Sequence, residues 1–120
     1  MAAQAPKAVM VIQTDCTDPA REQEFNEWYN NIHVPDVLLT PGVIRGTRFA
    51  LATTPREGQS KFLAIYELDT TDFEGVQKSL GEVMAKVREQ GRWSDLVKVG
   101  GFGLSFYSLI SDRVKVGATV

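Results

Sequence analysis

The stretch Phe25-Asn26-Glu27-Trp28-Tyr29-Asn30-Asn31-Ile32-His33-Val34-Pro35-Asp36 has the periodicity of an amphipathic helix and contains the only histidine of the chain. Its large apolar side chains recur at i, i+3, i+4 and i+7 and therefore share one helical face: Phe25, Trp28, Tyr29 and Ile32. His33 follows Tyr29 by four residues and lies at the edge of that face. Because proline disfavours helical geometry in the preceding residue, Pro35 predicts that the helix ends at about Ile32 or His33. The imidazole, two aromatic rings and the Asp36 carboxylate are thus expected at one helix terminus.

The segments on either side of this helix predict the element order β-α-β-β-α-β. Strands are expected over residues 8–15, 43–52, 60–68 and 104–110, from their β-branched and apolar side chains. Asp18-Pro19 favours the start of the first helix, and Thr71 and Glu74 have capping-box spacing at the start of a second, which runs to about residue 88. Residues 90–103 are expected to connect it to the last strand, and residues 114–120 to form a weak edge strand or lie disordered.

This order predicts an α+β, ferredoxin-like fold, in which a four-stranded antiparallel sheet carries both helices on one face. The 120 residues are expected to form a single domain. The last predicted strand is apolar on both sides, so a monomer would leave apolar side chains exposed to water. A two-fold homodimer packed sheet to sheet, a dimeric α/β barrel, is the simplest way to cover that face.

Composition excludes several other classes of protein. The formal net charge of -2, with no cluster of basic residues, argues against a nucleic-acid partner. No apolar stretch is long enough for a membrane span, and the N-terminus does not resemble a secretory signal. The single cysteine, Cys16, indicates a reducing compartment, with the cytoplasm as the default. One histidine and one cysteine do not form a zinc site, and we expect no metal and no cofactor.

Several short motifs occur in a suggestive order: Trp28-Tyr29, His33-x-Pro35-Asp36, Pro41-Gly42, Arg48-Phe49 and Phe62-Leu63-Ala64-Ile65-Tyr66-Glu67-Leu68. Together they resemble the EthD-like branch of the dimeric α/β-barrel superfamily, over residues 9–68 and weakly after Leu80. The wider superfamily includes cofactor-free cyclases, lactone isomerases, dehalogenating and decarboxylating enzymes, quinol-forming monooxygenases and haem degraders. The resemblance therefore implies a homodimer with a small-molecule pocket in each subunit, and it names no substrate.

His33 is the main candidate for acid–base chemistry, because an unperturbed imidazole with a pKa near ~6.5 exchanges protons at neutral pH. The alternative is a histidine that only interacts with the carbonyls at a helix C-terminus. Tyr29 is a candidate to orient His33 or to donate a hydrogen bond to a substrate oxygen, or else a core aromatic. Trp28 is expected to form core or pocket wall. Asp36 is either a hydrogen-bond partner of the imidazole or a solvated turn residue.

Arg48 is placed by the alternation of side chains along the second strand. If the second and third strands form a hairpin with Arg48 opposite Ala64, Arg48 and Tyr66 are diagonal neighbours on one face of the sheet. Arg45 and Glu67 then pair on the other face. An arginine beside a tyrosine and small residues is suited to hold a carboxylate or phenolate. The alternative is a structural ion pair, within the chain or across the dimer.

The interpretation that combines these features is a small, cofactor-independent isomerase, cyclase or lyase that transfers a proton on an apolar, aromatic or cyclic metabolite. His33 acts as acid or base, Tyr29 and Arg48 polarise an oxygen, and Trp28, Tyr66 and Asp36 contact the substrate. His33 is expected to face a mostly apolar pocket walled by Trp28 or Tyr29 and by Tyr66. The alternatives are an oxygenase, cofactor-free or haem-linked, and a ligand-binding or accessory protein without catalytic activity.

Overall fold

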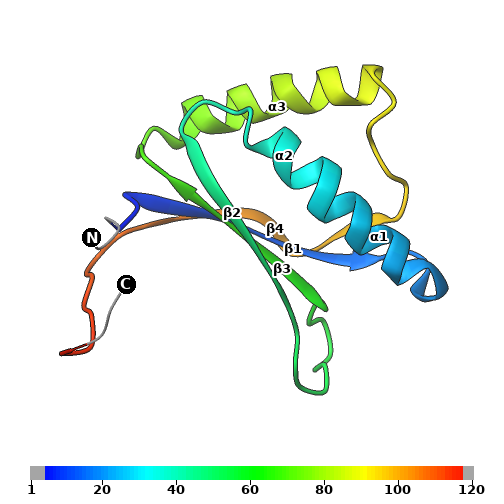
Figure 1. Ribbon diagram of the computed structural model, residues 1–120, viewed down its shortest axis with the longest axis horizontal. Coiled ribbons are helices and arrows are strands. Elements are labelled where there is room, and N and C mark those ends of the chain that lie inside the picture. Colours follow the sequence, from blue (N-terminus) through cyan, green and yellow to red (C-terminus); the bar gives the residue numbers. More distant parts are fainter. Residues whose placement is uncertain (1–4, 118–120) are drawn as a thin grey trace.

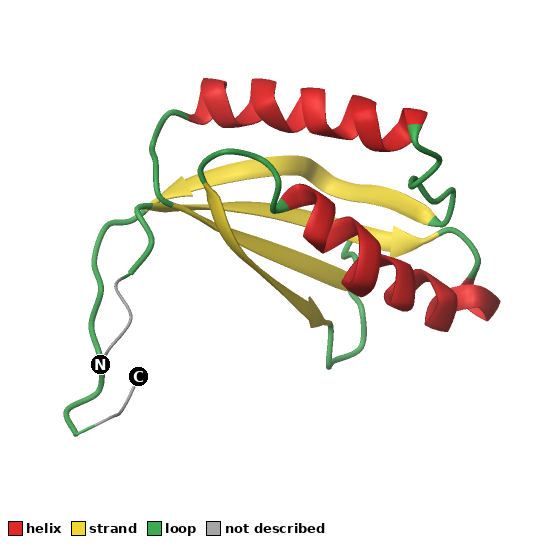
Figure 2. Ribbon diagram, turned by 45° about the horizontal axis from the view of Figure 1, so that its top comes forward, coloured by secondary structure: helices red, strands yellow, loops and turns green. Residues whose placement is uncertain are grey.

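A four-stranded antiparallel sheet carries all of the helices on one face in the computed structural model, which describes residues 5–117 (Figures 1 and 2). The strands are β1 (Ala8–Cys16), β2 (Val43–Ala50), β3 (Phe62–Leu68) and β4 (Val97–Ser108), in the spatial order β2-β3-β1-β4. Between β1 and β2 lie a 3₁₀ turn η1 (Pro19–Arg21), α1 (Glu22–Trp28), a π-helical turn η2 (Tyr29–His33) and α2 (Val34–Val37), and α3 (Phe73–Glu89) joins β3 to β4. The predicted α+β, ferredoxin-like arrangement is confirmed.

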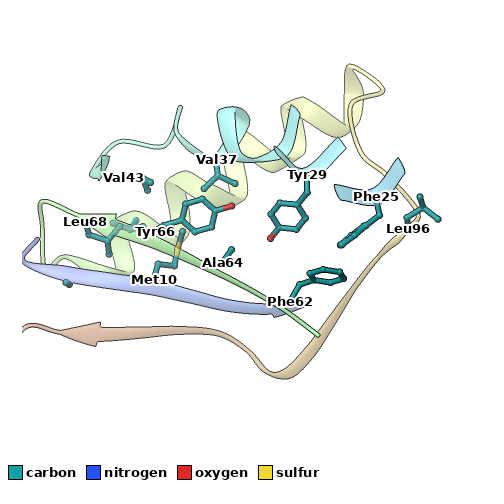
Figure 3. Close-up of a cluster of buried hydrophobic side chains, with 12 residues drawn as sticks. Met10, Phe25, Tyr29, Val37, Val43, Phe62, Ala64, Tyr66, Leu68 and Leu96 are labelled. Carbon is teal, nitrogen blue, oxygen red and sulfur yellow. The ribbon is translucent and has the colours of Figure 1, made fainter. Parts of the chain in front are cut away.

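The core lies between the sheet and the helices, because alternate side chains of each strand point toward them. On β3 the buried positions alternate strictly with partly buried ones: Phe62, Ala64, Tyr66 and Leu68. Phe25 and Tyr29 descend from the helix onto this layer and are completely buried, as Figure 3 shows. The apolar helical face that the sequence predicts is therefore the face that packs on the sheet.

The predicted register of β2 and β3 is also confirmed. Gly46 pairs with Tyr66, which puts Arg48 and Tyr66 on the helix-covered face of the sheet. Arg45 pairs with Glu67 on the opposite face, with 3.5 Å between Arg45 Nε and Glu67 Oε2. A Cβ on Gly46 would lie only 2.9 Å from the Tyr66 ring, so the absence of a side chain there lets this tyrosine lie across the neighbouring strand.

The prediction that Pro35 ends the first helix near His33 is wrong. The helix passes through the π-turn η2, in which the Val34 N–H bonds to the Tyr29 carbonyl in an i→i+5 pattern, and continues through α2 to Val37. Pro35 lies in the first turn of α2, a position where its missing N–H is tolerated. His33 therefore projects from the middle of a helical run and not from its terminus.

Three other boundaries differ from the sequence prediction. The N-cap of α3 is Asp72, whose Oδ1 accepts from the Gly75 N–H at 3.0 Å, and no capping box involving Thr71 forms. β4 begins at Val97, seven residues before the predicted start. Its first residues pair with the end of β1, beyond a shift in register between Ile12 and Thr14. A weak edge strand was one of the two expectations for residues 114–120. Residues 114–117 form no strand, and residues 118–120 lie outside the described part of the chain.

Candidate functional site

A small apolar cavity of about 110 Å³ lies between the sheet and the helices α2 and α3. Its wall consists of His33, Tyr66 and Trp93, together with aliphatic and methionine side chains of β1, α2, α3 and β4. An engineered cavity of about 150 Å³ is known to hold benzene, so this one is suited to roughly a single ring. Larger hollows of about 300 to 320 Å³ lie beside the β2–β3 hairpin, along the β1–β4 edge and beside Arg48, and none of them includes the imidazole. The smaller cavity is therefore the candidate site. His33 and Tyr66 are in its wall as expected, but the prediction that Trp28 or Tyr29 also forms the wall is wrong, and Arg48 lines a separate hollow.

His33 is surrounded by aromatic rings and is only 8% exposed. Its imidazole stacks on Trp28, with 4.9 Å between ring centroids and an interplanar angle of 18°. Tyr29 and Trp93 meet it edge-on, at centroid distances of 4.7 and 5.6 Å. The three rings fix the orientation of the imidazole and remove it from bulk water.

Burial lowers the pKa of His33 from 6.5 to about 4. The Asp36 carboxylate opposes this effect, and the positive charge of Arg48 adds to it. The expected near-neutral pKa is therefore wrong, because a low-dielectric surrounding disfavours the charged imidazolium. At neutral pH His33 is uncharged and has one nitrogen free to accept a proton.

The hydroxyl groups of Tyr29 and Tyr66 lie between the helix and the sheet (Figure 3). The two side chains are 0% and 1% exposed. The two hydroxyls lie near each other, and Thr14 lies near that of Tyr29, so that each affects its neighbour's pKa, but neither makes a hydrogen bond of standard geometry within residues 5–117. Burial raises the pKa of both hydroxyls, so both remain protonated donors at neutral pH. Tyr29, for which a purely structural role was the alternative, thus brings a free donor to the sheet.

Arg48 lies beside these tyrosines on the helix-covered face of the sheet. Its guanidinium carbon is 4.1 Å from the centre of the Tyr29 ring, a cation–π contact. Nη1 donates to Asn30 Oδ1 at 2.8 Å, whereas Nη2 is buried and has no partner among the described residues. Within residues 5–117 of one subunit, no carboxylate forms an ion pair with Arg48.

Asp36 neither bonds to the imidazole nor lies in solvent, so both predictions for it are wrong. It is 5% exposed, and its two oxygens accept from Arg92 Nε and Nη2 at 2.9–3.2 Å. Nor does Asp36 belong to the cavity wall. Through Arg92 it connects residues 91–96, which lie between α3 and β4, to α2.

Two residues of this segment were missed by the sequence analysis: Arg92, which pairs with Asp36, and Trp93, which forms part of the cavity wall. The Arg92 carbonyl also accepts a hydrogen bond from Trp28 Nε1 at 2.9 Å. Trp28 therefore stacks on the imidazole and also bonds to the backbone of residues 91–96. Trp93 packs edge-on against Trp28 and is covered by Arg88, whose guanidinium carbon lies 4.5 Å from its ring. No periodicity marks these contacts, since they join residues about 60 positions apart.

Replacement of Arg92 by Met is expected to loosen residues 91–96. The guanidinium supplies all of the bonds between this segment and the Asp36 carboxylate, whereas the aliphatic stem of Met preserves packing. Backbone amides in the segment should exchange several-fold faster in hydrogen-exchange mass spectrometry, with β1 and β3 unchanged. Arg56→Met, in the exposed β2–β3 loop, is the matched control. Unchanged exchange in residues 91–96 of the Arg92 variant would contradict a holding role for the ion pair.

Other kinds of site are not seen in the described residues. Within residues 5–117, no three histidine, cysteine, aspartate or glutamate side chains gather in a way that would hold a metal ion. None of the helices in that range has the length and apolar character needed to cross a membrane.

A scan of known family models and a search of curated proteins find no match for this chain. Solved structures do match. An EthD family protein from Bacillus halodurans has a TM-score of 0.52 and 19% identity, with 86% of this chain and 97% of that one covered. A dimeric ferredoxin-like protein from an uncultured marine organism has a TM-score of 0.55 and 16% identity, and the match covers 92% of this chain and 93% of that one. A monooxygenase, ActVA-Orf6 of Streptomyces coelicolor in complex with nanaomycin D, has a TM-score of 0.56 and 13% identity, with 92% and 93% covered.

These similarities extend over nearly the whole of each chain, and they define the class of fold. The protein has the ferredoxin-like fold found in dimeric proteins of this kind, including the EthD family. The resemblance inferred from the sequence motifs is thus confirmed for the fold.

Proposed function

We propose that this protein is a small enzyme of the isomerase, cyclase or lyase type, which moves a proton on an apolar, single-ring metabolite. The observation that carries this proposal is the uncharged, buried imidazole of His33 in the wall of an otherwise apolar cavity. A neutral imidazole is a base, and a dry cavity strengthens any electrostatic interaction with the charge that develops during proton removal. His33 acts as the base, and Tyr29 and Arg48 polarise the substrate oxygen.

The solvent-exchange reaction tests this function without knowledge of the final product. An enzyme that removes a proton from carbon and returns one from water exchanges that position with D₂O. The protein is incubated with a panel of single-ring ketones, enones and lactones, and exchange is followed by proton NMR. We expect exchange into at least one member well above the buffer rate. Binding of panel members without any exchange would contradict the proposal and favour a ligand carrier.

An oxygenase is the second candidate. The same base would convert a bound phenol to its electron-rich anion, which reacts with O₂ more readily, and the similar fold of a monooxygenase in complex with nanaomycin D supports this alternative. Oxygen consumption during turnover distinguishes it from isomerisation.

We further propose that the protein acts as a cytoplasmic homodimer. The sheet face opposite the helices is uncovered (Figure 1) and carries apolar side chains of all four strands: Val9, Val11, Phe49, Leu63, Ile65 and Tyr107. Phe49 and Tyr107 are 52% and 59% exposed, as expected for a face that a second copy covers. The dimeric ferredoxin-like protein of similar fold supports the same arrangement.

Light scattering at micromolar concentration is expected to give twice the chain mass of 13.3 kDa. Ile65→Lys places a charge in the centre of the uncovered face and should shift the protein to the monomer, because burial of an unpaired charge is strongly unfavourable. Gln77→Lys adds the same charge on the exposed surface of α3 and should leave the dimer intact. A clean monomer for the unmodified protein would contradict the sheet-to-sheet dimer.

A further inference from the structure

Tyr29, Tyr66 and Arg48 bring three hydrogen-bond donors to one buried place between the helix and the sheet. Among the described residues, four buried side-chain polar atoms have no partner, and three of them belong to this group: Tyr29 Oη, Tyr66 Oη and Arg48 Nη2. Buried polar groups are nearly always hydrogen-bonded, and each unpartnered one costs about 1–3 kcal/mol. The two hydroxyls lie close enough to influence each other and Thr14, yet none of the three donors has an acceptor in standard geometry among the described residues.

The group is connected to the cavity through Tyr66. This side chain lines the cavity beside His33, and its hydroxyl lies toward Tyr29 (Figure 3). Arg48 is held over the Tyr29 ring and tied by Nη1 to Asn30, which leaves Nη2 directed into buried space. Gly46 keeps room for the Tyr66 ring, since a Cβ there would lie 2.9 Å from it. The donors are thus fixed in place by the fold.

We propose that Tyr29, Tyr66 and Arg48 form a receptor for a single enolate oxygen, and that the substrate is a small cyclic carbonyl compound with a removable α-proton. This inference rests on the proposed function of His33. A carbonyl oxygen enters among the donors while the ring occupies the cavity. Two neutral hydroxyls and one guanidinium, without a fixed carboxylate, match an oxygen that is neutral at first and gains negative charge during the reaction.

The step balances without a co-reactant. The imidazole of His33 takes the α-proton, and the electrons of the broken C–H bond form a carbon–carbon double bond. The carbonyl π electrons move to the oxygen, which becomes the enolate that the three donors stabilise. When the substrate also carries a β,γ double bond, the anion is a dienolate, and return of the proton to its γ-carbon gives the α,β-unsaturated isomer and restores neutral His33. The imidazolium exists only beside the enolate, whose negative charge favours it.

Substituted phenols test the receptor separately from the reaction, because a phenolate imitates the charge and shape of an enolate but undergoes no proton transfer at carbon. The probe is 4-nitrophenol, whose anion has its own long-wavelength absorption band. At a pH below the pKa of the free probe, addition of protein should increase this band. We expect the phenolate to bind at least about 10-fold more tightly than the neutral phenol, since hydrogen bonds to a charged group are the stronger ones.

Tyr29→Phe and Tyr66→Phe each remove one hydroxyl and keep the ring. Each should weaken phenolate binding by about 10- to 100-fold, the scale of one hydrogen bond to a charged group. Because neither hydroxyl makes a hydrogen bond of standard geometry within residues 5–117, neither variant should be less resistant to urea than the unmodified protein. Tyr107→Phe, on the uncovered sheet face, and Arg45→Met, on the opposite face of β2 from Arg48, are the matched controls and should bind normally.

The outcomes separate the receptor from the proposed enzyme. Phenolate binding that both tyrosine variants retain overturns the receptor, and so does reduced stability of the variants, which would show that the hydroxyls bond to one another. Solvent exchange with full rates in both tyrosine variants supports His33 as the base of the proposed reaction, and it overturns both the receptor and the polarising role of Tyr29. Phenolate binding that depends on both hydroxyls, without exchange into any ketone, supports the receptor and contradicts the proposed reaction.

Discussion

Replacement of His33 by Phe is expected to lower the rate of deuterium exchange into a substrate by about 10²-fold or more, the usual contribution of a general base. The phenyl ring retains the stack on Trp28 and the edge contacts with Tyr29 and Trp93, and only the nitrogen that accepts the proton is lost. The measurement is the initial exchange rate at saturating substrate, followed by NMR. Because the receptor hydroxyls are untouched, phenolate binding should change much less than the rate.

The control for this experiment is Tyr107→Phe, which alters an aromatic side chain on the uncovered face of the sheet and should leave the rate unchanged. Circular dichroism and urea unfolding establish that both variants are folded. A His33→Phe protein that folds, binds phenolates and exchanges protons at the full rate would show that His33 is a core residue. The base would then have to be another group.

The second large effect concerns the stability of the fold in acid. Burial holds the pKa of His33 at about 4, whereas an unfolded histidine titrates near 6.5. Between these values the unfolded chain gains a proton that the folded chain does not, so the free energy of unfolding falls as the pH falls. At about 1.4 kcal/mol for each pH unit, the His33 contribution lost from about pH 6.5 to pH 4 is roughly 3 kcal/mol. Above pH 6.5 this contribution is fully retained.

Urea unfolding of the unmodified protein and of His33→Phe, over the same pH series, isolates this contribution. The carboxylates titrate in both proteins, including Asp36, which acts on His33, and the positively charged Arg48 is also common to both. The difference in the free energy of unfolding between the two should therefore change by about 3 kcal/mol between pH 6.5 and pH 4. A difference that stays constant across this range would mean that His33 is accessible to protons in the folded state.

Together the two predictions describe an imidazole that is uncharged in the empty site and accepts a proton only during the reaction. A base with a pKa of about 4 is weak in the empty site, and its strength rises only when a negative charge forms beside it. The proposed enolate oxygen supplies that charge. Substrate binding and proton removal are then coupled through the same buried group of donors.

Much of the architecture follows from local patterns in the sequence. The alternation of side chains in residues 62–68 determines which of them face the helices, and the same rule places Arg48 with Tyr66 and Arg45 with Glu67. The helical period of residues 25–32 likewise determines the face that packs on the sheet. Such patterns can be read from the sequence because the period of a helix or strand depends on neighbouring residues, and the register of a hairpin depends on the turn that joins its two strands.

The sequence by itself therefore determined the order of the elements, the side-chain alternation of β2 and β3 and the pairing of these two strands. It also marked His33, Tyr29, Tyr66 and Arg48 as the residues to consider. Only the tertiary structure decided that Asp36 pairs with Arg92, that Trp93 closes the cavity and that the pKa of His33 is far below its ordinary value. These features arise where segments distant in the sequence pack together and exclude water, and burial of that kind depends on the path of the whole chain.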